Sequence, residues 1–386
     1  MALLSGRRVL IDGRTAGSVG GGFTYLANIV GHLLRQEPGI TLRVLVGNDR
    51  LRRAIPPSER LETLQVSASD PLRRLWFTYV SGAREARQWG ADLYYSPAEF
   101  APVRAPCAVI AAFRNPNVFT PLDQGWSLRQ RIRLATLRKL AELSGRRCDA
   151  ILFVSEDSAR WIGDVVSLPE ERRAVVHHGI DASAWSQVSE PPPLDRPYVL
   201  SVSTIYRYKN FVRLIEAWTR LARLRPELPD LAIVGNDADP PYAARMREAR
   251  AAAGPLADRI HLVGEVPYAE VRAWYAGASL FVFPSYLETF GHPLLEAMAS
   301  GVPVVAADIP VFRELGADAA LYADPLSEDA LADAMRAVLD DPSLAAGLVE
   351  RGHERVGHFT WGRAAERLAS LFADVLQKRE AAAVRA

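Results

Sequence analysis

The chain has 386 residues, of which 49% are hydrophobic and 24% charged, a balance typical of globular proteins that excludes a disordered chain. The 46 basic and 45 acidic residues nearly cancel, so no net field favours nucleic acid as a partner. Two cysteines exclude a disulfide framework, and no run reaches the roughly 18 apolar residues of a membrane span. Without a signal-peptide pattern either, the sequence predicts a cytoplasmic protein.

Short apolar strands alternate with helical patterns along nearly the whole chain. In the first half, the strand candidates are 8–11, 42–46, 93–95, 108–112, 151–154 and 174–176. In the second half, they are 198–202, 231–234, 260–262, 280–283 and 302–306. Near-continuous apolar runs of this length are typical of parallel strands buried on both faces. The pattern therefore predicts an α/β, doubly wound fold.

The alternation is interrupted at 189–197, where three consecutive prolines follow Glu190. Proline stops both helix and strand, so this segment predicts a connector between domains. At roughly 100–200 residues per domain, the length also predicts two domains. We expect two Rossmann-like halves that meet near residue 190, with ligands in the cleft outside the carboxyl ends of the strands.

A glycine-rich loop follows the first predicted strand and includes Gly17, Gly20, Gly21 and Gly22. Glycine lets a phosphate or a sugar approach the backbone closely, so Gly21 and Gly22 are candidate donor-binding residues. A plain tight turn is the alternative. The dinucleotide fingerprint Gly-x-Gly-x-x-Gly fails here, because its last position is Tyr25.

The most informative segment is 283–305, where a buried strand is followed by a loop that carries Glu288. Pro293 suits the first position of a helix. Gly291 and the helix start expose unpaired backbone N–H groups, which favours a phosphate there. Glu288 and Glu296 flank this site, where each can accept hydrogen bonds from sugar or ribose hydroxyls. The alternative is a solvated loop acid and a favourable first-turn acid.

This segment resembles the retaining family-4 glycosyltransferases of GT-B fold (glycosyltransferase group 1), whose signature is two glutamates with seven residues between the first and the second. The matching residues are Glu288, Phe290, Gly291, Pro293, Glu296, Ala297, Gly301 and Pro303. The resemblance, looser elsewhere, implies transfer of a sugar from a nucleotide diphosphate donor with retained anomeric configuration and no metal or cofactor. It implies an acceptor-binding domain at 1–189, a nucleotide-sugar-binding domain at 190–358 and a last helix, 359–386, that crosses back to the first domain.

The resemblance also assigns roles to residues. Glu296 is expected to hold the donor ribose and Glu288 to contact the donor sugar. The resemblance further implies that Phe290, Gly291, His292 and Pro293 bind the donor. It also implies that backbone groups at Gly264 and Val266 lie near the base.

One departure from the family pattern concerns the diphosphate. Relatives carry an arginine five positions before a diphosphate-binding lysine; here the lysine is Lys209 and the earlier position is Thr204. A departing nucleoside diphosphate gains negative charge, and without a metal two cations must stabilise it. We therefore expect Arg207 to supply the second cation, beside Thr204 in the donor site. The alternative is that Lys209 is a surface residue.

A second departure follows the strand 108–112, where many relatives place a His-Asp pair. This chain has Arg114 and Asn115 at that point. Either residue is a candidate contact for the donor sugar or the acceptor. The loss of the imidazole leaves no obvious protein base there.

The stretch 126–147 carries seven cations against the single acid Glu142. Apolar residues recur in it at roughly helical spacing, and Trp126 suits an interface. These features predict docking on anionic lipid at the inner face of the membrane, in keeping with a lipid-linked acceptor. A helix with a solvated basic face is the alternative.

The sequence thus predicts a retaining, metal-independent enzyme that moves a hexose or deoxyhexose, with a mannosyl group favoured, to a glycan, glycolipid or small-molecule acceptor in polysaccharide or glycoconjugate biosynthesis. Asp237 and Asp239 match an Asp-x-Asp metal motif, but that motif belongs to the other major transferase fold. The alternatives are a sugar-nucleotide epimerase or phosphorylase of the same fold, or a non-catalytic nucleotide-sugar-binding subunit. The base, the sugar, the linkage and the oligomeric state stay open.

Overall fold

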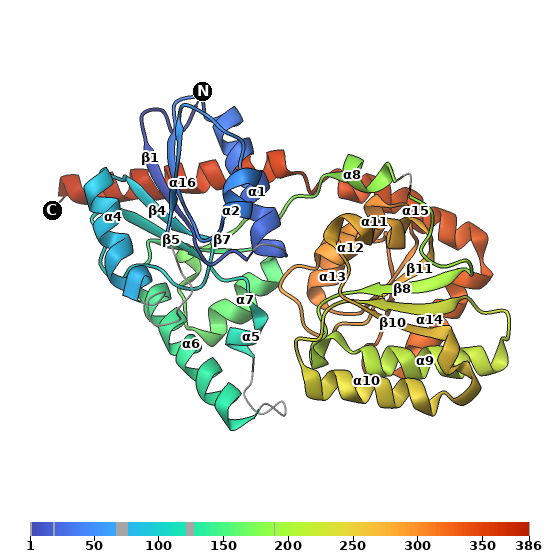
Figure 1. Ribbon diagram of the computed structural model, residues 1–386. Helices are drawn as coiled ribbons and strands as arrows, with labels where there is room; N and C mark the ends of the chain where they lie inside the picture. Colours follow the sequence, from blue (N-terminus) through green and yellow to red (C-terminus); the bar gives the residue numbers. More distant parts are fainter. Residues whose placement is uncertain (1, 18–19, 67–75, 121–126, 189, 386) are drawn as a thin grey trace. The chain divides into compact units, whose positions relative to one another are not determined.

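The computed structural model describes residues 2–17, 20–66, 76–120, 127–188 and 190–385, which form two compact units (Figure 1). Unit 1 comprises Met1–Gly179 and Trp361–Ala386, and unit 2 comprises Ile180–Thr360. The division therefore lies ten residues before the predicted boundary. The reason is Trp185, which is buried against the tyrosines of a unit 2 helix and so ties the segment after Gly179 to unit 2.

Unit 1 is built on a seven-stranded sheet in which all paired strands are parallel, in the order β3-β2-β1-β4-β5-β6-β7. The strands are β1 (Arg8–Gly13), β2 (Thr41–Val46), β3 (Leu61–Gln65), β4 (Leu93–Ser96), β5 (Ala108–Ala112), β6 (Ala150–Phe153) and β7 (Arg173–Val175). The helices are α1 (Gly21–Gln36), α2 (Asp49–Ala54), η1 (Phe77–Ser81), α4 (Gly82–Trp89), α5 (Pro116–Phe119), α6 (Leu128–Arg147), α7 (Glu156–Val165), η2 (Glu170–Arg172) and α16 (Trp361–Arg385). The last of these, α16, packs against α1 and β5.

Unit 2 is built on a six-stranded parallel sheet in the order β10-β9-β8-β11-β12-β13. The strands are β8 (Tyr198–Val202), β9 (Asp230–Val234), β10 (Ile260–Gly264), β11 (Ala278–Phe283), β12 (Val304–Ala307) and β13 (Leu321–Ala323). The helices are α8 (Ala182–Ser186), η3 (Arg207–Lys209), α9 (Phe211–Leu224), α10 (Pro240–Ala252), η4 (Gly254–Arg259), α11 (Tyr268–Ala276), α12 (His292–Ala299), α13 (Pro310–Gly316), α14 (Glu328–Asp340) and α15 (Pro342–Val356).

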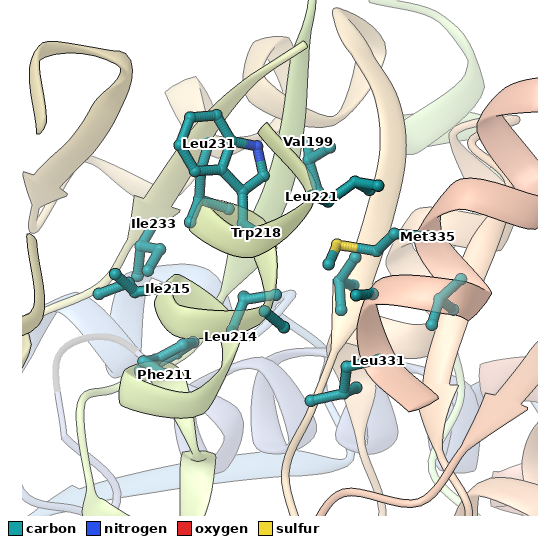
Figure 2. Close-up of a cluster of buried hydrophobic side chains, with 14 of the residues drawn as sticks. Val199, Phe211, Leu214, Ile215, Trp218, Leu221, Leu231, Ile233, Leu331 and Met335 are labelled. Atoms are coloured by element: carbon teal, nitrogen blue, oxygen red, sulfur yellow. The ribbon is translucent and has the colours of Figure 1, made fainter. Parts of the chain in front are cut away.

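The core of unit 2 lies between its sheet and the helices α9 and α14. Trp218 of α9 is fully buried there, and its indole N–H donates to the carbonyl of Pro229 over 3.0 Å. Figure 2 shows Trp218 beside Leu231 of β9, with Met335 and Leu331 contributed by α14. Helices cover both faces of the sheet, since α9 and α10 lie on one side and α11, α12 and α13 on the other (Figure 1).

Two strands, β3 and β13, were not predicted from the sequence pattern. Both lie at a sheet edge. In β3 no residue is buried, and Glu62 and Gln65 interrupt the apolar pattern, while β13 has only three residues. Apolar periodicity identifies strands that are covered on both faces, and an edge strand carries little of that signal.

In both sheets the order of the strands reverses once, between β1 and β4 in unit 1 and between β8 and β11 in unit 2. The predicted doubly wound α/β fold is confirmed by this topology. Ligands of such sheets bind outside the carboxyl ends of the strands at the point of reversal. In unit 2 that point is flanked by the loops that follow β8 and β11. Across the described residues, no helix is both long and apolar enough to cross a bilayer.

Candidate functional site

The loops after β8 and β11 are bound to each other by hydrogen bonds. The backbone N–H of Tyr286 donates to the carbonyl of Tyr208 over 3.0 Å. Asn210 has a left-handed backbone, with φ of 64°, and is buried. Its side-chain amide donates to the carbonyls of Pro284 (3.1 Å) and Pro325 (2.6 Å). These bonds fix η3, and therefore Lys209, against the loop that carries the predicted sugar contact.

Lys209 and Glu288 form a buried ion pair across these two loops. The ammonium Nζ donates to Glu288 Oε1, and the two residues are only 8% and 9% exposed. The Lys209 ammonium also lies 5.2 Å from the ring centroid of Tyr208 and 5.7 Å from that of Phe283. The alternative readings, a surface lysine and a solvated loop acid, are wrong. Burying two charges costs desolvation energy, so a buried ion pair is weak evidence for a role in stability. A functional role for the pair is therefore favoured.

Gly291 starts α12 with a backbone that only glycine adopts readily. Its φ is 114°, and a Cβ placed there would lie 2.8 Å from Cε1 of Phe312. The helix then begins at His292, so Pro293 occupies the second helical position rather than the predicted first. Phe290 is buried, and its ring packs 5.1 Å from that of His292. Gly291 and His292 thus turn the start of the helix toward the carboxyl edge of the sheet, as an anion site requires.

Glu296 lies inside the fold beneath α11 and is 7% exposed. Tyr268 donates its hydroxyl to Oε1 over 3.1 Å, and Tyr275 donates to Oε2 over 3.2 Å. Burial raises the pKa of the Glu296 carboxyl to about 7, although both phenols and Arg272 favour its ionised form. The sequence indicated the glutamate. It offered no signal for the two tyrosines, which reach the carboxyl only because α11 packs beside α12.

Arg207 points to a different acid from Lys209. Its guanidinium donates to both carboxylate oxygens of Asp239, over 2.9 Å (Nε to Oδ2) and 3.2 Å (Nη2 to Oδ1), and Asp239 is almost fully buried. Asp237 lies 3.4 Å from Nη1 of Arg247. The Asp-x-Asp pair is therefore engaged by arginines, and among the described residues no group of three His, Cys, Asp or Glu side chains could hold a metal ion.

A cavity of about 420 Å³ opens at the carboxyl ends of β9 and β10. It is lined by Gly264, predicted to lie near the base, together with apolar side chains such as Ile205 and Met246 and the charged side chains of Asp237 and Arg247. Gly264 has a φ of 82°, and a Cβ there would meet no atom. Thr204 and Val266 lie in the loops after β8 and β10, and both are half-buried.

The remaining predicted residues lie in unit 1. Gly21 and Gly22 form the first turn of α1; a Cβ at Gly21 would point into open space, and one at Gly22 would meet only Ala16. Residues 18 and 19 of this glycine loop lie outside the described residues. The backbone N–H groups of Arg114 and Asn115 both donate to Oε1 of Glu99, over 3.1 and 2.8 Å.

Glu99 is a further candidate that the sequence reading missed, because nothing near it in the chain suggests a buried carboxylate. The Arg114 guanidinium lies 5.0 Å from the ring centroid of Tyr25. Unit 1 thus gathers Arg114, Asn115 and Glu99 at the carboxyl ends of β4 and β5, while unit 2 gathers Lys209, Glu288 and the start of α12.

Comparison with known proteins identifies relatives for both units. A family model described as "Glycosyl transferases group 1" matches residues 186–355, and one described as "Glycosyltransferase Family 4" matches 19–184. The lipopolysaccharide core biosynthesis mannosyltransferase LpsB of Rhizobium meliloti is 33% identical over 275 residues, which cover 64% of this chain and 73% of LpsB. The O-antigen chain mannosyltransferase B of Escherichia coli is 33% identical over 288 residues, covering 71% of this chain and 72% of that protein. The O-antigen chain mannosyltransferase RfbU of Salmonella typhimurium is 29% identical over 205 residues, covering 53% of this chain and 55% of RfbU.

Solved structures share the fold at low sequence identity. The glycosyltransferase WaaG, involved in lipopolysaccharide biosynthesis, superimposes with a TM-score of 0.70 at 16% identity, covering 94% of this chain and 99% of WaaG. Anabaena HepE in complex with UDP-glucose superimposes with a TM-score of 0.72 at 17% identity, covering 95% and 99%. These likenesses confirm the predicted GT-B fold, two Rossmann-like parallel-sheet domains.

Proposed function

Because the chain is a glycosyltransferase that belongs to family 4, the group 1 glycosyltransferases, we propose that it transfers a hexose or deoxyhexose from a nucleotide diphosphate sugar to a glycan or lipid-linked acceptor. A mannosyl group is favoured, since LpsB, RfbU and the Escherichia coli relative are all named as mannosyltransferases of O-antigen or lipopolysaccharide core biosynthesis. None of these three relatives is named as a non-catalytic subunit or an epimerase, so they do not support either alternative.

The observation that carries this proposal is the buried Lys209–Glu288 pair beside the start of α12. When the donor binds, the Lys209 ammonium can exchange part of its contact with Glu288 for a diphosphate oxygen. Glu288 is then able to accept a hydroxyl hydrogen of the donor sugar. The N–H groups at the start of α12 add partial positive charge at the diphosphate. Glu296 accepts the ribose hydroxyls.

The proposed reaction retains the anomeric configuration. The bond between the sugar C1 and the diphosphate oxygen breaks with its electron pair passing to the diphosphate, and the acceptor oxygen bonds to C1 on the same face. The acceptor proton passes to the departing phosphate oxygen. Charge on the leaving group grows along this path, so cations near the diphosphate bind the transition state more tightly than the substrate.

Unit 2 is proposed to bind the nucleotide sugar, and unit 1 the acceptor. In unit 1, Arg114 and Asn115 are proposed to contact the acceptor or the donor sugar, and Gly21 and Gly22 to contact the donor. No step in this scheme needs a divalent cation. Transfer should therefore persist in excess EDTA. Loss of transfer in EDTA, with recovery on adding manganese or magnesium, would contradict metal independence and point back to Asp237 and Asp239.

A panel of nucleoside diphosphates tests the donor class. Thermal unfolding is followed with UDP, GDP, ADP and dTDP, and the nucleotide of the true donor should raise the midpoint most, because a ligand present at about 100 times its Kd adds about 2.7 kcal/mol to stability. The matching monophosphate is the control and should act more weakly, since it lacks the outer phosphate. Transfer is then assayed with the corresponding nucleotide sugars. A panel in which no nucleotide shifts unfolding would contradict the proposed function.

We also propose that α6 docks on the anionic inner face of the membrane. Leu128 and Ile132 are 71% and 60% exposed on this helix, and Arg129, Arg131 and Arg133 are exposed around them. Trp126, which the sequence reading included, lies outside the described residues. An exposed apolar pair among cations suits the boundary between headgroups and acyl chains.

Vesicle sedimentation tests this docking. Replacing Arg129, Arg131 and Arg133 by serine should weaken binding to phosphatidylglycerol vesicles about 100-fold, since each cation near the surface contributes about 1 kcal/mol. The control replaces three exposed cations elsewhere (Arg223, Arg367 and Lys378) and should leave binding nearly unchanged. Equal binding of the native chain to phosphatidylcholine and phosphatidylglycerol would contradict the proposal.

A further inference from the structure

Glu296 is surrounded by aromatic side chains that have no role in the proposed reaction. Glu296 sits between two phenols, each of which bonds a different oxygen of its carboxyl. Trp185 of α8 stands nearly perpendicular to both phenol rings, at 5.8 Å from Tyr268 and 5.4 Å from Tyr275, and holds them in place. Three aromatic side chains from two helices therefore converge on one buried acid.

The two phenols are fixed as hydrogen-bond donors. Burial and the adjacent carboxyl raise the pKa of both Tyr268 and Tyr275 well above the ordinary value of 10. Neither tyrosine can therefore lose its proton near neutral pH. Each offers its hydrogen to an oxygen of Glu296, and a phenol donor stabilises the ionised form of that carboxyl over the neutral one.

The carboxyl must be ionised to serve the ribose. An ionised carboxylate has about four acceptor positions, of which the phenols take two. The other two can accept two neighbouring ribose hydroxyls. A protonated carboxyl carries a hydrogen on one oxygen and so loses acceptor capacity. Burial pushes Glu296 toward that protonated form and raises its pKa to about 7, so at neutral pH the balance depends on its hydrogen-bond donors.

Resting on the proposed function, we propose that Tyr268 and Tyr275 are positioning residues for the nucleotide donor, because their hydroxyls hold Glu296 ionised and oriented so that it accepts the ribose hydroxyls. The two differ in access. Tyr275 is fully buried, whereas Tyr268 is 41% exposed at the start of α11, directly after the loop predicted to meet the base. Tyr268 is therefore the member of the pair that can be altered with least effect on packing.

Other charged and titratable groups near this cluster come from α11, from α12 and from the helices packed on α12. From α11, Arg272 acts on the carboxyl and lies 5.6 Å from the ring of Trp185. From the helices packed on α12, Arg313 of α13 pairs with Asp308, and His353 of α15 lies beside Gly301, beyond the end of α12. His292 begins α12 itself. The phenols of Tyr268 and Tyr275 are the hydrogen-bond donors to this carboxyl.

The test measures nucleoside diphosphate affinity by calorimetry between pH 6 and pH 9, with the nucleotide that the panel selects. Affinity of the native chain should rise with pH through about 7 and then level off. Tyr268→Phe and Tyr275→Phe should move this midpoint up by about one pH unit, because each removes a donor to the ionised form. At pH 7 the variants should bind about fivefold more weakly, because the ionised fraction of Glu296 falls from about a half to about a tenth, and at pH 9 they should recover most of that loss. Glu296→Gln should bind weakly at every pH.

The 2′,3′-dideoxy form of the same nucleotide is the matched ligand control. It lacks both hydroxyls, so its affinity should be low and should follow only the ionisation of its own terminal phosphate, with the same pH profile in the native chain and in both Phe variants. Tyr322→Phe is the matched protein control; its hydroxyl donates to the carbonyl of Phe312 over 3.1 Å, and its loss should leave the pH profile unchanged.

The outcomes separate this inference from the proposed function. A Tyr268→Phe loss of equal size at every pH, or one that persists with the dideoxy ligand, would overturn the positioning role. The positioning role would also be overturned if the pH profile of Tyr268→Phe matched the native profile while Glu296→Gln still abolished the pH dependence. In that case the proposed function would still hold. If no nucleoside diphosphate binds the native chain, both fall. If Tyr275→Phe does not fold, the half-exposed Tyr268 carries the test.

Discussion

Lys209 is buried with a full charge, and its carboxylate partner Glu288 is buried equally deeply. Removing either side chain leaves the other buried without its ion-pair partner, so the cost of the removal exceeds the value of the contact itself. The pair is at the same time the part of the site best placed to meet a diphosphate. Under the proposed function, stability and activity depend on the same two side chains, and a single substitution cannot separate them.

Lys209→Ala should lower turnover about 10²–10³-fold, the usual cost of losing a charge-assisted donor in a closed site. It should also destabilise the chain by about 3–5 kcal/mol, because Glu288 is left buried without its partner. The double variant Lys209→Met with Glu288→Gln should recover most of the stability and none of the turnover. Urea unfolding and initial rates measure the two effects. A surface control, Lys378→Ala, should change neither.

Arg207 poses a separate question, because its guanidinium is held by the buried carboxylate of Asp239. If Arg207 supplies the second cation at the diphosphate, Arg207→Ala should lower kcat more than donor affinity, by about as much as Lys209→Ala does. Arg207→Lys should recover little of the loss, since an ammonium cannot keep the two-point contact with Asp239. Normal turnover in Arg207→Ala would leave Lys209 and α12 as the diphosphate site.

At the scale of single elements, the start of α12 depends on one glycine. A residue with a Cβ at position 291 would need a positive φ and would meet the ring of Phe312. Gly21, at the start of α1, differs in both respects: it has a helical backbone, and a Cβ there would point into open space. Gly291 is therefore required by the backbone conformation and packing at the start of α12, whereas Gly21 leaves open space at the start of α1.

Gly291→Ala should destabilise the chain by about 1–3 kcal/mol, the usual cost of a strained backbone position, and should weaken nucleotide binding because the helix start moves. Gly21→Ala should leave stability unchanged or raise it by up to about 1 kcal/mol. If a ligand approaches the backbone there, Gly21→Ala should nevertheless lower transfer. Thermal unfolding and transfer assays are run on both variants. Full activity in Gly21→Ala would remove this loop from the site.

At the scale of the whole molecule, the buried acid Glu296 makes stability depend on pH and links it to the proposed donor site. Its pKa rises from an ordinary 4.5 to about 7 on folding, so the folded chain binds more protons than the unfolded chain between those values. Stability should therefore fall as pH rises from about 4.5 to about 7 and stay lower above that range. Burial in the fold favours the neutral form of Glu296, whereas the proposed ribose contact needs the ionised form.

Glu296→Gln should accordingly be more stable than the native chain at pH 8, by up to about 3 kcal/mol, although it binds the donor poorly. The difference should shrink as pH falls through this range and vanish near pH 4.5. Urea unfolding at a series of pH values measures it. A Glu296→Gln stability that parallels the native chain at every pH would show that the carboxyl titrates normally.

The sequence alone determined the α/β architecture, the strands covered on both faces and the residues that match the glutamate motif, because apolar periodicity and local motifs are properties of neighbouring residues. The edge strands β3 and β13, the boundary near Gly179 and the partners of the charged side chains were decided by tertiary structure. Lys209 finds Glu288 79 residues away, and Glu296 finds Tyr268 and Tyr275 at 28 and 21 residues. Such partners are brought together only when parallel strands place their carboxyl ends at one edge and helices pack side by side, which no local pattern encodes.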